Sequence, residues 1–215
     1  MVNVKQQATL FAADEPEDIG DDLDYYETPE WCWDAVAPIV RAALDRMPRS
    51  YLIEPAAGRG ALLGYVLHSV EVCAAQAIEL HPKRFRQLRA QWEALATCRQ
   101  GDFLSMQIDA PVKNRRALVV LNPPYSKPRK TIGQEFVERS LKLATPKGIV
   151  VALLPLAFAA GQGRAALHQR YASSIYVLSE RPGFGGEHDT GSKDYAWFVW
   201  DLAHPKREWG ALVRP

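Results

Sequence analysis

The feature that most constrains the fold is the alternation of short apolar runs with longer segments whose apolar residues recur at helical spacing. Short apolar runs bounded by Gly, Pro or polar residues predict strands, and the 3.6-residue spacing predicts helices packed on them. This alternation is typical of an α/β domain with a mostly parallel sheet and helices on both faces. Seven strands are expected, over residues 51–53, 72–78, 97–103, 117–121, 149–154, 174–179 and 195–202.

The first expected helix has residues suited to its two ends. Thr28 is a good N-cap, Pro29 suits the first helical position, and Pro48 follows the last turn. The last two strands are joined by a helix-free, Gly-rich loop, residues 183–194, which predicts an antiparallel hairpin at the edge of the sheet. Further helices are expected over residues 61–68, 82–95, 132–144 and 162–170.

The chain of 215 residues fits a single domain. We expect this domain over residues 23–205, with a flexible acidic tail over 1–22 and a C-terminal tail over 206–215. Residues 1–30 hold nine acids and one lysine, which leaves 25 basic and 16 acidic residues in 31–215, a net charge of +9. A basic body is what a protein needs to bind the phosphate backbone of a nucleic acid.

Composition argues against several other classes of protein. No apolar run approaches the roughly 18 residues of a membrane-spanning helix, and residues 1–11 lack the build of a signal peptide. We therefore expect a cytoplasmic protein with no membrane partner. The three cysteines, Cys32, Cys73 and Cys98, are far apart and form no C-x-x-C pair. This spacing favours reduced thiols over a zinc site or a disulfide framework, and no metal is expected.

In parallel α/β sheets, ligands bind beyond the carboxyl ends of the strands. After the first strand, Gly58 and Gly60 form a turn that lets the backbone approach a ligand, as many nucleotide cofactors require. The dinucleotide fingerprint G-x-G-x-x-G is not met, because residue 63 is Leu. Glu79 ends the second strand, where it can bind a ribose diol or serve as an N-terminal helix acid. Asp102 ends the third, where it can accept from an adenine amino group or shape a turn.

The strongest signal is Asn122-Pro123-Pro124-Tyr125, which follows the apolar run 117–121. Two prolines remove two backbone donors and hold the chain extended. The Asn122 side chain and the Pro123 carbonyl then remain as acceptors beside an aromatic plane. Two such acceptors can take both hydrogens of an –NH₂ on a flat ring while Tyr125 stacks on that ring. A rigid turn after a core strand is the structural alternative.

Together these residues resemble the amino-methyltransferases with a class I, Rossmann-like S-adenosylmethionine fold, over roughly residues 25–202. Glu54-Pro55-Ala56-Ala57-Gly58-Arg59-Gly60 is similar to the cofactor loop of that family, normally Asp/Glu-Pro-x-x-Gly-x-Gly. The resemblance implies that Glu79 holds the cofactor ribose and that Asp102-Phe103 frames its adenine. Thr28-Pro29 resembles the element that contacts the methionine end in DNA amino-methyltransferases. Asn122 to Tyr125 matches the catalytic tetrapeptide, and Asn in its first position favours adenine N6 over cytosine N4.

The implied function is transfer of a methyl group from S-adenosylmethionine to N6 of adenine in DNA, without a covalent intermediate or a metal. A base inside a duplex cannot be reached, so the adenine must be flipped out or single-stranded. Asn122, which also belongs to the implied cofactor site, and the Pro123 carbonyl would accept the N6 hydrogens. They would aim its lone pair at the sulfonium methyl while Tyr125 stacks on the base.

DNA methyltransferases usually carry a separate target-recognition region, for which residues 104–116 and 203–215 leave no room. Relaxed or short sequence specificity is therefore expected. Candidate DNA contacts are Ser126-Lys127-Pro128-Arg129-Lys130, which suits phosphates, and Gly183-Phe184-Gly185-Gly186-Glu187-His188, whose rings could replace a flipped base. Each loop is alternatively a solvated connection. A basic helix face is better explained as a solvated surface; it comprises Lys83, Arg84, Arg86 and Arg89.

Near the N-terminus, Gln7-Ala8-Thr9-Leu10-Phe11 resembles the Gln-x-x-Leu-Phe peptide by which bacterial proteins dock on the replication sliding clamp. A disordered segment that orders on binding is the physical route, so the clamp is a candidate partner.

Two other classes of function stay open. The same tetrapeptide serves methyltransferases that act on RNA adenine or on a release-factor glutamine, because both substrates present an –NH₂ on a planar group. The glutamine enzymes carry an additional N-terminal helical domain, which is not expected here. A non-enzymatic subunit that kept only the fold is the other class. Such proteins usually lose the tetrapeptide or the cofactor loop, and this chain retains both.

Overall fold

The computed structural model describes residues 27–46, 50–108, 116–125, 129–183 and 193–215. Predictions that fall on other residues remain predictions, and these concern the tail 1–22, the segment Gln7–Phe11, Lys127, Phe184 and His188. In the described part of the chain, no helix is both long and apolar enough to cross a membrane.

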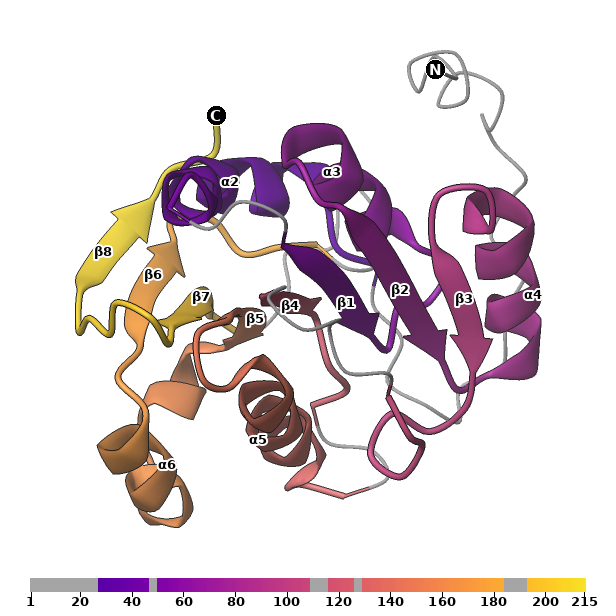
Figure 1. Ribbon diagram of the computed structural model, residues 1–215. Helices are drawn as coiled ribbons and strands as arrows, with labels where there is room; N and C mark the ends of the chain where they lie inside the picture. Colours follow the sequence, from indigo (N-terminus) through magenta and orange to yellow (C-terminus); the bar gives the residue numbers. More distant parts are fainter. Residues whose placement is uncertain (1–26, 47–49, 109–115, 126–128, 184–192) are drawn as a thin grey trace.

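One eight-stranded sheet runs through the molecule. Its strands are β1 (Tyr51–Pro55), β2 (Ala74–Glu79), β3 (Thr97–Gln100), β4 (Ala117–Leu121), β5 (Ile149–Pro155), β6 (Ser174–Leu178), β7 (Tyr195–Asp201) and β8 (Trp209–Leu212). They lie in the order β3-β2-β1-β4-β5-β7-β6-β8 (Figure 1). Strands β1 to β5 are parallel, whereas β7 runs antiparallel to both neighbours, β5 and β6. The predicted mostly parallel sheet is confirmed.

Helices cover both faces of the sheet, as predicted. The α-helices are α2 (Glu30–Leu44), α3 (Ala61–Ser69), α4 (Pro82–Trp92), α5 (Ile132–Ala144) and α6 (Ala165–Arg170), and two short 3-10 helices, η2 (Leu156–Ala159) and η3 (Gln162–Arg164), precede α6. Figure 1 shows α2 and α3 on one side of the sheet and α5 and α6 on the other. Buried side chains of α2, α3 and α4 share one core, and those of α5 and α6 share the other.

The central strand β4 shows why the two cores form. Leu118 and Val120 belong to the core under α2, while Val119 and Leu121 belong to the core under α5. All are fully buried, because side chains alternate between the two faces of a strand and both faces are covered. The same apolar run therefore fixes β4 at the centre of the sheet and carries the chain directly to Asn122.

The predicted antiparallel hairpin of β6 and β7 is confirmed, and β7 lies between β5 and β6. The predicted number of seven strands was wrong. An eighth strand, β8, pairs in parallel with β6 and forms the edge. Residues 206–215, expected as a tail, thus contribute a strand to the domain.

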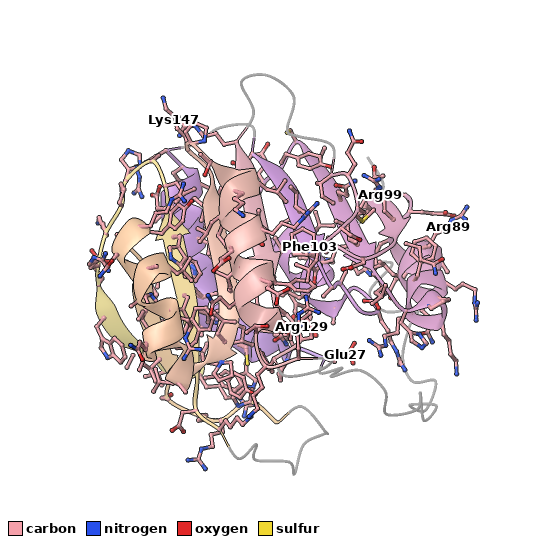
Figure 2. The ribbon with its side chains drawn as sticks, turned by 90° about the horizontal axis from the view of Figure 1, so that it is seen from below. Glu27, Arg89, Arg99, Phe103, Arg129 and Lys147 are labelled. Atoms are coloured by element: carbon pink, nitrogen blue, oxygen red, sulfur yellow. The ribbon has the colours of Figure 1, made fainter. Side chains whose placement is uncertain are left out.

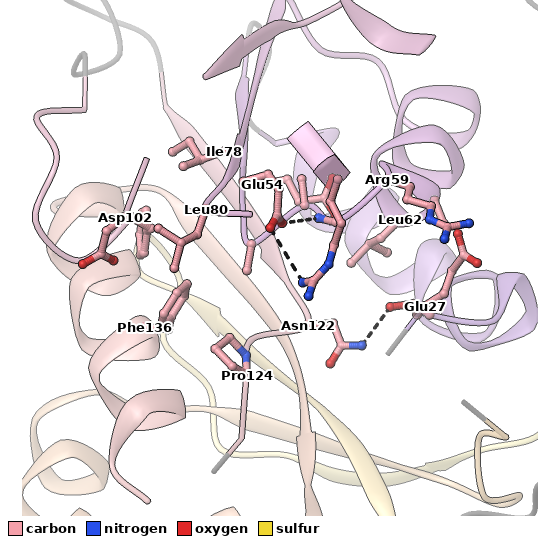
Figure 3. Close-up of a pocket in the computed structure, with 18 of the residues that line it drawn as sticks. Glu27, Glu54, Arg59, Leu62, Ile78, Leu80, Asp102, Asn122, Pro124 and Phe136 are labelled. Carbon is pink, nitrogen blue, oxygen red and sulfur yellow. Dashed lines mark hydrogen bonds and ion pairs between the residues drawn. The ribbon is translucent and has the colours of Figure 1, made fainter. Parts of the chain in front are cut away.

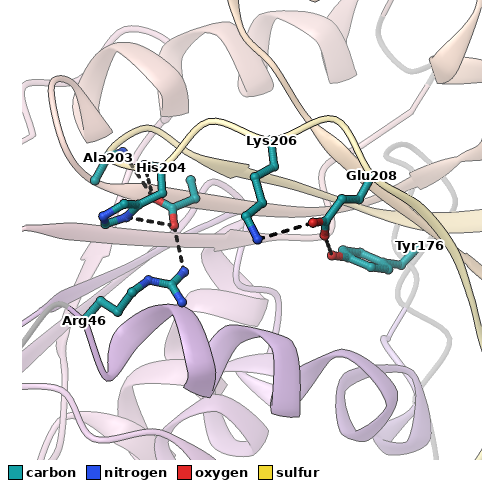
Figure 4. Close-up of polar contacts among 7 residues, drawn as sticks. Arg46, Tyr176, Ala203, His204, Lys206 and Glu208 are labelled. Carbon is teal, nitrogen blue, oxygen red and sulfur yellow. Dashed lines mark hydrogen bonds and ion pairs between the residues drawn. The ribbon is translucent and has the colours of Figure 1, made fainter.

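Polar contacts hold this C-terminal segment against the sheet (Figure 4). The Asp201 carboxylate accepts hydrogen bonds from the backbone N–H groups of Ala203 (3.1 Å) and His204 (3.0 Å), which turn the chain at the end of β7. The Tyr176 hydroxyl of β6 then donates to Glu208 at 3.0 Å. Because β8 has four residues and Trp209 is 64% exposed, its apolar pattern was too weak to predict a strand.

Two element boundaries near the functional residues also differ from the prediction. Helix α2 begins at Glu30 with Pro29 as its N-cap and no side-chain cap, so Thr28 does not cap the helix. Strand β3 ends at Gln100, which places Asp102 and Phe103 in the turn that follows it.

Candidate active site

A cleft opens at the carboxyl ends of β1, β2 and β4 and encloses about 870 Å³ of space continuous with solvent (Figure 3). Figure 2 shows Glu27 and Arg129 toward this end of the sheet, with Lys147, which precedes β5, at the opposite end. Of the residues predicted to bind cofactor or substrate, those that line the cleft are Thr28, Glu54, Ala56, Gly58, Glu79, Asp102, Phe103, Asn122 and Pro124. The structure therefore brings residues from four separate strand ends into one space.

Other predicted residues lie beside the cleft without lining it. Pro29 caps α2, Pro55 ends β1, Gly60 is the N-cap of α3, and Pro123 is buried. Tyr125 lies on the far side of the motif, where it lines a different cavity.

The loop after β1 is built from backbone conformations that favour glycine. Gly58 has φ 59° and Gly60 has φ 91°. Ala56 has φ 57°, although a residue with a Cβ loses roughly 1 kcal/mol or more in this region. The Ala57 N–H donates to the Ile78 carbonyl of β2 at 2.8 Å, and the Gly60 N–H donates back to Ala57. The tight loop thereby presents its backbone to the cleft.

Glu79 holds that loop in place. The residue is only 3% exposed, and its two carboxylate oxygens accept hydrogen bonds from the backbone N–H groups of Gly58 and His81, both at 2.8 Å. Arg84 of α4 lies 3.7 Å from the same carboxylate and is itself buried. The interpretation of Arg84 as part of a solvated basic face was therefore wrong.

Glu54 lies deeper in the cleft and is buried. Burial in an apolar environment raises the pKa of its carboxyl well above the ordinary value of 4.5, and the neighbouring charge of Glu79 raises it further. A backbone hydrogen bond from Leu63 opposes this rise. Glu54 therefore keeps its proton at pH values where an exposed glutamate has lost it.

This shift makes stability depend on pH, and replacing Glu54 by Gln is expected to remove that dependence. An acid whose pKa is raised in the folded state contributes fully to the stability of the fold below about pH 4.5, its ordinary pKa. This contribution to the unfolding free energy is lost as the pH rises through the raised pKa of the folded state. Within that window one proton changes the unfolding free energy by at most about 1.4 kcal/mol per pH unit. Urea denaturation at pH 5 and pH 8 should therefore show that the unfolding free energy falls less between the two pH values for Glu54→Gln than for the unmodified protein.

Glu93→Gln is the matched control, because Glu93 is exposed and pairs only locally with Arg89 at 2.7 Å. It should follow the pH dependence of the unmodified protein. Equal losses of stability for Glu54→Gln and Glu93→Gln would contradict the raised pKa.

Asn122 is held from two sides. Its Nδ2 donates to the Thr28 hydroxyl at 3.0 Å, across 94 residues of sequence. Its Oδ1 accepts a hydrogen bond from the Tyr125 hydroxyl, which also donates to the Leu153 carbonyl at 3.3 Å. The Tyr125 ring packs against Tyr195, with centroids 5.5 Å apart. The amide is thus oriented before any substrate binds, with its acceptor oxygen occupied by the hydroxyl.

The turn after β3 is fixed by helix α5. Asp102 accepts from the Leu104 N–H at 2.9 Å, the turn geometry that was the alternative interpretation of this residue, and it also lines the cleft. The Phe103 ring packs on Phe136 of α5 at 5.1 Å. Arg139, also on α5, lies 5.3 Å from the centroid of Phe103 and donates to the Leu104 carbonyl at 2.7 Å.

Several cleft residues were not predicted from the sequence: Glu27, Arg84, Ile132 and Phe136. Leu80, which directly follows Glu79 at a strand end, also lines the cleft and is 50% exposed. Phe136 and Ile132 follow helical spacing, which indicates a buried face but does not distinguish a core from a cleft wall.

The two described cations of the predicted phosphate-binding loop differ from each other. Arg129 forms a two-pronged ion pair with Glu135, and Thr131 donates to the same carboxylate at 2.8 Å. These bonds lower the pKa of Glu135 to about 2. Lys130 is exposed and lines the cavity that Tyr125 lines.

The protein resembles known proteins in structure and not in sequence. No protein-family model matches the sequence, and no curated protein matches it significantly. A Listeria monocytogenes protein provisionally described as a class I S-adenosylmethionine-dependent methyltransferase matches with a TM-score of 0.70 and 15% identity, over 91% of this chain and 68% of its own. A Pyrococcus horikoshii protein provisionally described as an RNA methyltransferase has a TM-score of 0.64 and 14% identity, over 92% and 96%. DrdV in complex with DNA has a TM-score of 0.56 and 13% identity, over 87% of this chain and 27% of its own.

At such identities the likeness defines the fold alone. The fold is a Rossmann-like sheet with one antiparallel strand, β7, next to β5. More particularly, it is the fold of the class I methyltransferases.

Proposed function

We propose that this protein transfers a methyl group from S-adenosylmethionine to N6 of adenine in DNA. The observation that carries the proposal is the meeting of two elements in one cleft: Asn122 at the end of β4, and the loop containing Gly58 that Glu79 holds. One element suits an amino group on a flat ring, and the other suits a nucleotide-like cofactor.

The residues of the cleft fit S-adenosylmethionine in charge and in shape. This cofactor carries two positive groups, the sulfonium and the ammonium, against one carboxylate. Beside Glu54, whose raised pKa keeps it protonated, the cleft lining has three acids, Glu27, Glu79 and Asp102, against two bases, Arg59 and Arg84. For the adenine ring, the half-exposed Leu80 beside Phe103 and Phe136 offers an apolar wall. Glu79 retains lone pairs for a ribose diol beyond the two backbone bonds that it accepts.

When bound, the cofactor supplies a methyl group on a positively charged sulfur that is open to attack by an amine. Asn122 Oδ1 and the Pro123 carbonyl accept the two N6 hydrogens and turn the nitrogen lone pair toward that methyl group. Thr28 keeps the Asn122 amide in the orientation that presents its oxygen. The methylated nitrogen is cationic and therefore acidic, so it releases its proton to water. Most of the acceleration of methyl transfer comes from holding the amino group in line with the methyl group and from acceptors that are already in place.

Substrate binding requires one exchange of partners in this scheme. Asn122 Oδ1 accepts from the Tyr125 hydroxyl in the structure, and the adenine amino group takes the place of that hydroxyl. The released Tyr125 ring is then available to stack on the base, a contact of about 1–3 kcal/mol in other proteins. Tyr125 thus holds the amide in place until the substrate arrives.

The choice between DNA and RNA as the polymer depends on the charge of the protein, the structural matches and the contact of Thr28. The net charge of +9 over residues 31–215 suits either nucleic acid, and the structural matches include one protein bound to DNA and one provisionally described as acting on RNA. We favour DNA because Thr28-Pro29 resembles the element of DNA amino-methyltransferases and Thr28 contacts Asn122 directly. RNA adenine is the alternative substrate.

The proposal is tested by incubating the protein and S-adenosylmethionine with plasmid DNA from a methylation-free host, in parallel with an RNA transcript of the same sequence. Sequencing of modified bases is expected to find N6-methyladenine in the DNA, in contexts of no more than about four base pairs. Methylation of the transcript alone would replace DNA by RNA, and methylated cytosine would refute the assignment to adenine. A protein without catalytic activity would modify neither polymer.

A further inference from the structure

A second cavity of about 490 Å³, open to solvent, lies on the other side of the Asn-Pro-Pro-Tyr motif. It shares no described lining residue with the cleft, although Pro124 lines the cleft and Tyr125 lines this cavity. Two adjacent residues of the motif therefore form part of the wall of two different spaces. The second cavity is lined by Tyr125, Lys130, Gly133, Gln134, Leu154, Pro155, Ala157, Phe158 and Arg164.

The second cavity is basic where the cleft is acidic. Its described lining includes the cations Lys130 and Arg164 and no carboxylate. Gly133 and Gln134 belong to the first turn of α5, where the helix dipole and backbone N–H groups also favour negative charge. The nearby Glu135 is already neutralised by Arg129. The space is thus suited to an anion.

Arg164 is fixed in position before any ligand binds. Its Nε donates to the Phe158 carbonyl and its Nη2 to the Ala157 carbonyl, both at 2.9 Å, and Nη2 also contacts the Ala160 carbonyl. The guanidinium lies 5.0 Å from the Phe158 ring centroid. Gly161 has φ 117°, and a Cβ there would lie 2.8 Å from Arg164 Nη2. The turn is therefore built closely around this arginine, while Nη1 bonds to no described residue.

We propose that the second cavity binds the phosphodiester group next to the target nucleotide, through Arg164 and Lys130. The inference rests on the proposed function, because a base held at Asn122 is separated from its own phosphates by a single sugar. Those phosphates then lie within reach of the wall beyond Tyr125. A guanidinium held by three carbonyls and a ring loses little further freedom when it binds an anion, and Lys130 adds a mobile charge.

Neutral phosphate analogues test this inference. The substrates are single-stranded 12-mers with one central adenine and mixed neighbours, either unmodified or with uncharged methylphosphonates at the two linkages that flank the adenine. For the unmodified protein, neutral linkages should weaken binding about tenfold, measured by fluorescence anisotropy. Arg164→Gln and Lys130→Gln should each bind the unmodified 12-mer several-fold to tenfold more weakly, and the neutral linkages should weaken either variant by no more than about threefold further.

Arg170→Gln is the control. Arg170 is an exposed residue of α6 that does not line the cavity, and its substitution removes the same charge as Arg164→Gln. It should retain the full tenfold sensitivity to the neutral linkages. Lys130→Gln guards against a folding defect in Arg164→Gln, since Lys130 is exposed and outside the turn that Arg164 holds.

If Arg164→Gln and Lys130→Gln weaken binding of the neutral 12-mer by the same factor as binding of the charged 12-mer, neither side chain acts on the flanking phosphates. That result would overturn the inference. Failure of the proposed function is seen separately. In that case the unmodified protein transfers no methyl group to adenine, while the binding experiment still shows whether the cavity holds the flanking phosphate.

Discussion

Replacing Asn122 by Ala is expected to lower kcat for methyl transfer by about 10²- to 10³-fold and to leave the cofactor dissociation constant within about threefold. The reason is that the amide oxygen acts on the substrate amino group, whose bonding changes most in the transition state. The cofactor loop is held separately, by Glu79 and the backbone of Gly58. Single-turnover transfer of radiolabelled methyl, together with cofactor titration by calorimetry, measures the two quantities independently.

Thr28→Val is the graded comparison for this prediction. It removes only the hydroxyl that accepts from Asn122 Nδ2, so the acceptor oxygen remains but its orientation is less defined. A loss of about tenfold in kcat is expected, between the unmodified protein and Asn122→Ala. Near-normal turnover in Asn122→Ala would remove Asn122 from the mechanism. A parallel fall in thermal stability and cofactor binding would instead mark Asn122 as a structural residue.

Replacing Gly60 by Ala is expected to have the largest effect on stability, a loss of about 3 kcal/mol and a melting temperature about 6–12 °C lower. Gly60 has φ 91°, which a side chain disfavours. An added Cβ would also lie 2.4 Å from Nε1 of Trp92 and 2.8 Å from Cδ1 of Leu88. Both neighbours are buried, so neither can move aside freely. Urea denaturation and thermal melting measure the loss.

Gly163→Ala is the matched control, because a Cβ at Gly163 meets nothing within 4 Å. Its effect on stability should stay within about 0.5 kcal/mol. If Gly60→Ala costs no more than this control, the close packing of the loop on α4 is incorrect.

The motif at the end of β4 divides two spaces of opposite charge. The cleft on one side has three acids besides the protonated Glu54, against two bases, which suits a cationic methyl donor. The cavity on the other side has two bases and no described acid, which suits a phosphodiester. Asn122 and Tyr125 stand between them and contact each other. A methyl donor and a nucleotide could therefore approach the same amide from opposite sides.

The sequence determined the parts that depend on local pattern. The apolar run 117–121 predicted a fully buried strand because only a strand covered on both faces remains apolar throughout. Gly58 and Gly60 predicted a turn that brings the backbone close to a ligand, and both have positive φ values that few other residues adopt at low cost. Parallel strand ends meet at one edge of a sheet, so Glu79 and Asn122 were expected near one another and do line one cleft.

Only the tertiary structure decided which of these groups contact each other. Thr28 has the residue type of a helix cap, yet its hydroxyl accepts from Asn122, a contact that depends on how α2 crosses the sheet. Arg84 belongs to a basic helix pattern, but helix packing buries it beside Glu79. β8 is a strand because β6 leaves an edge to which four half-exposed residues can bond. Side-chain periodicity is a local property, whereas such contacts depend on the relative placement of elements far apart in the chain.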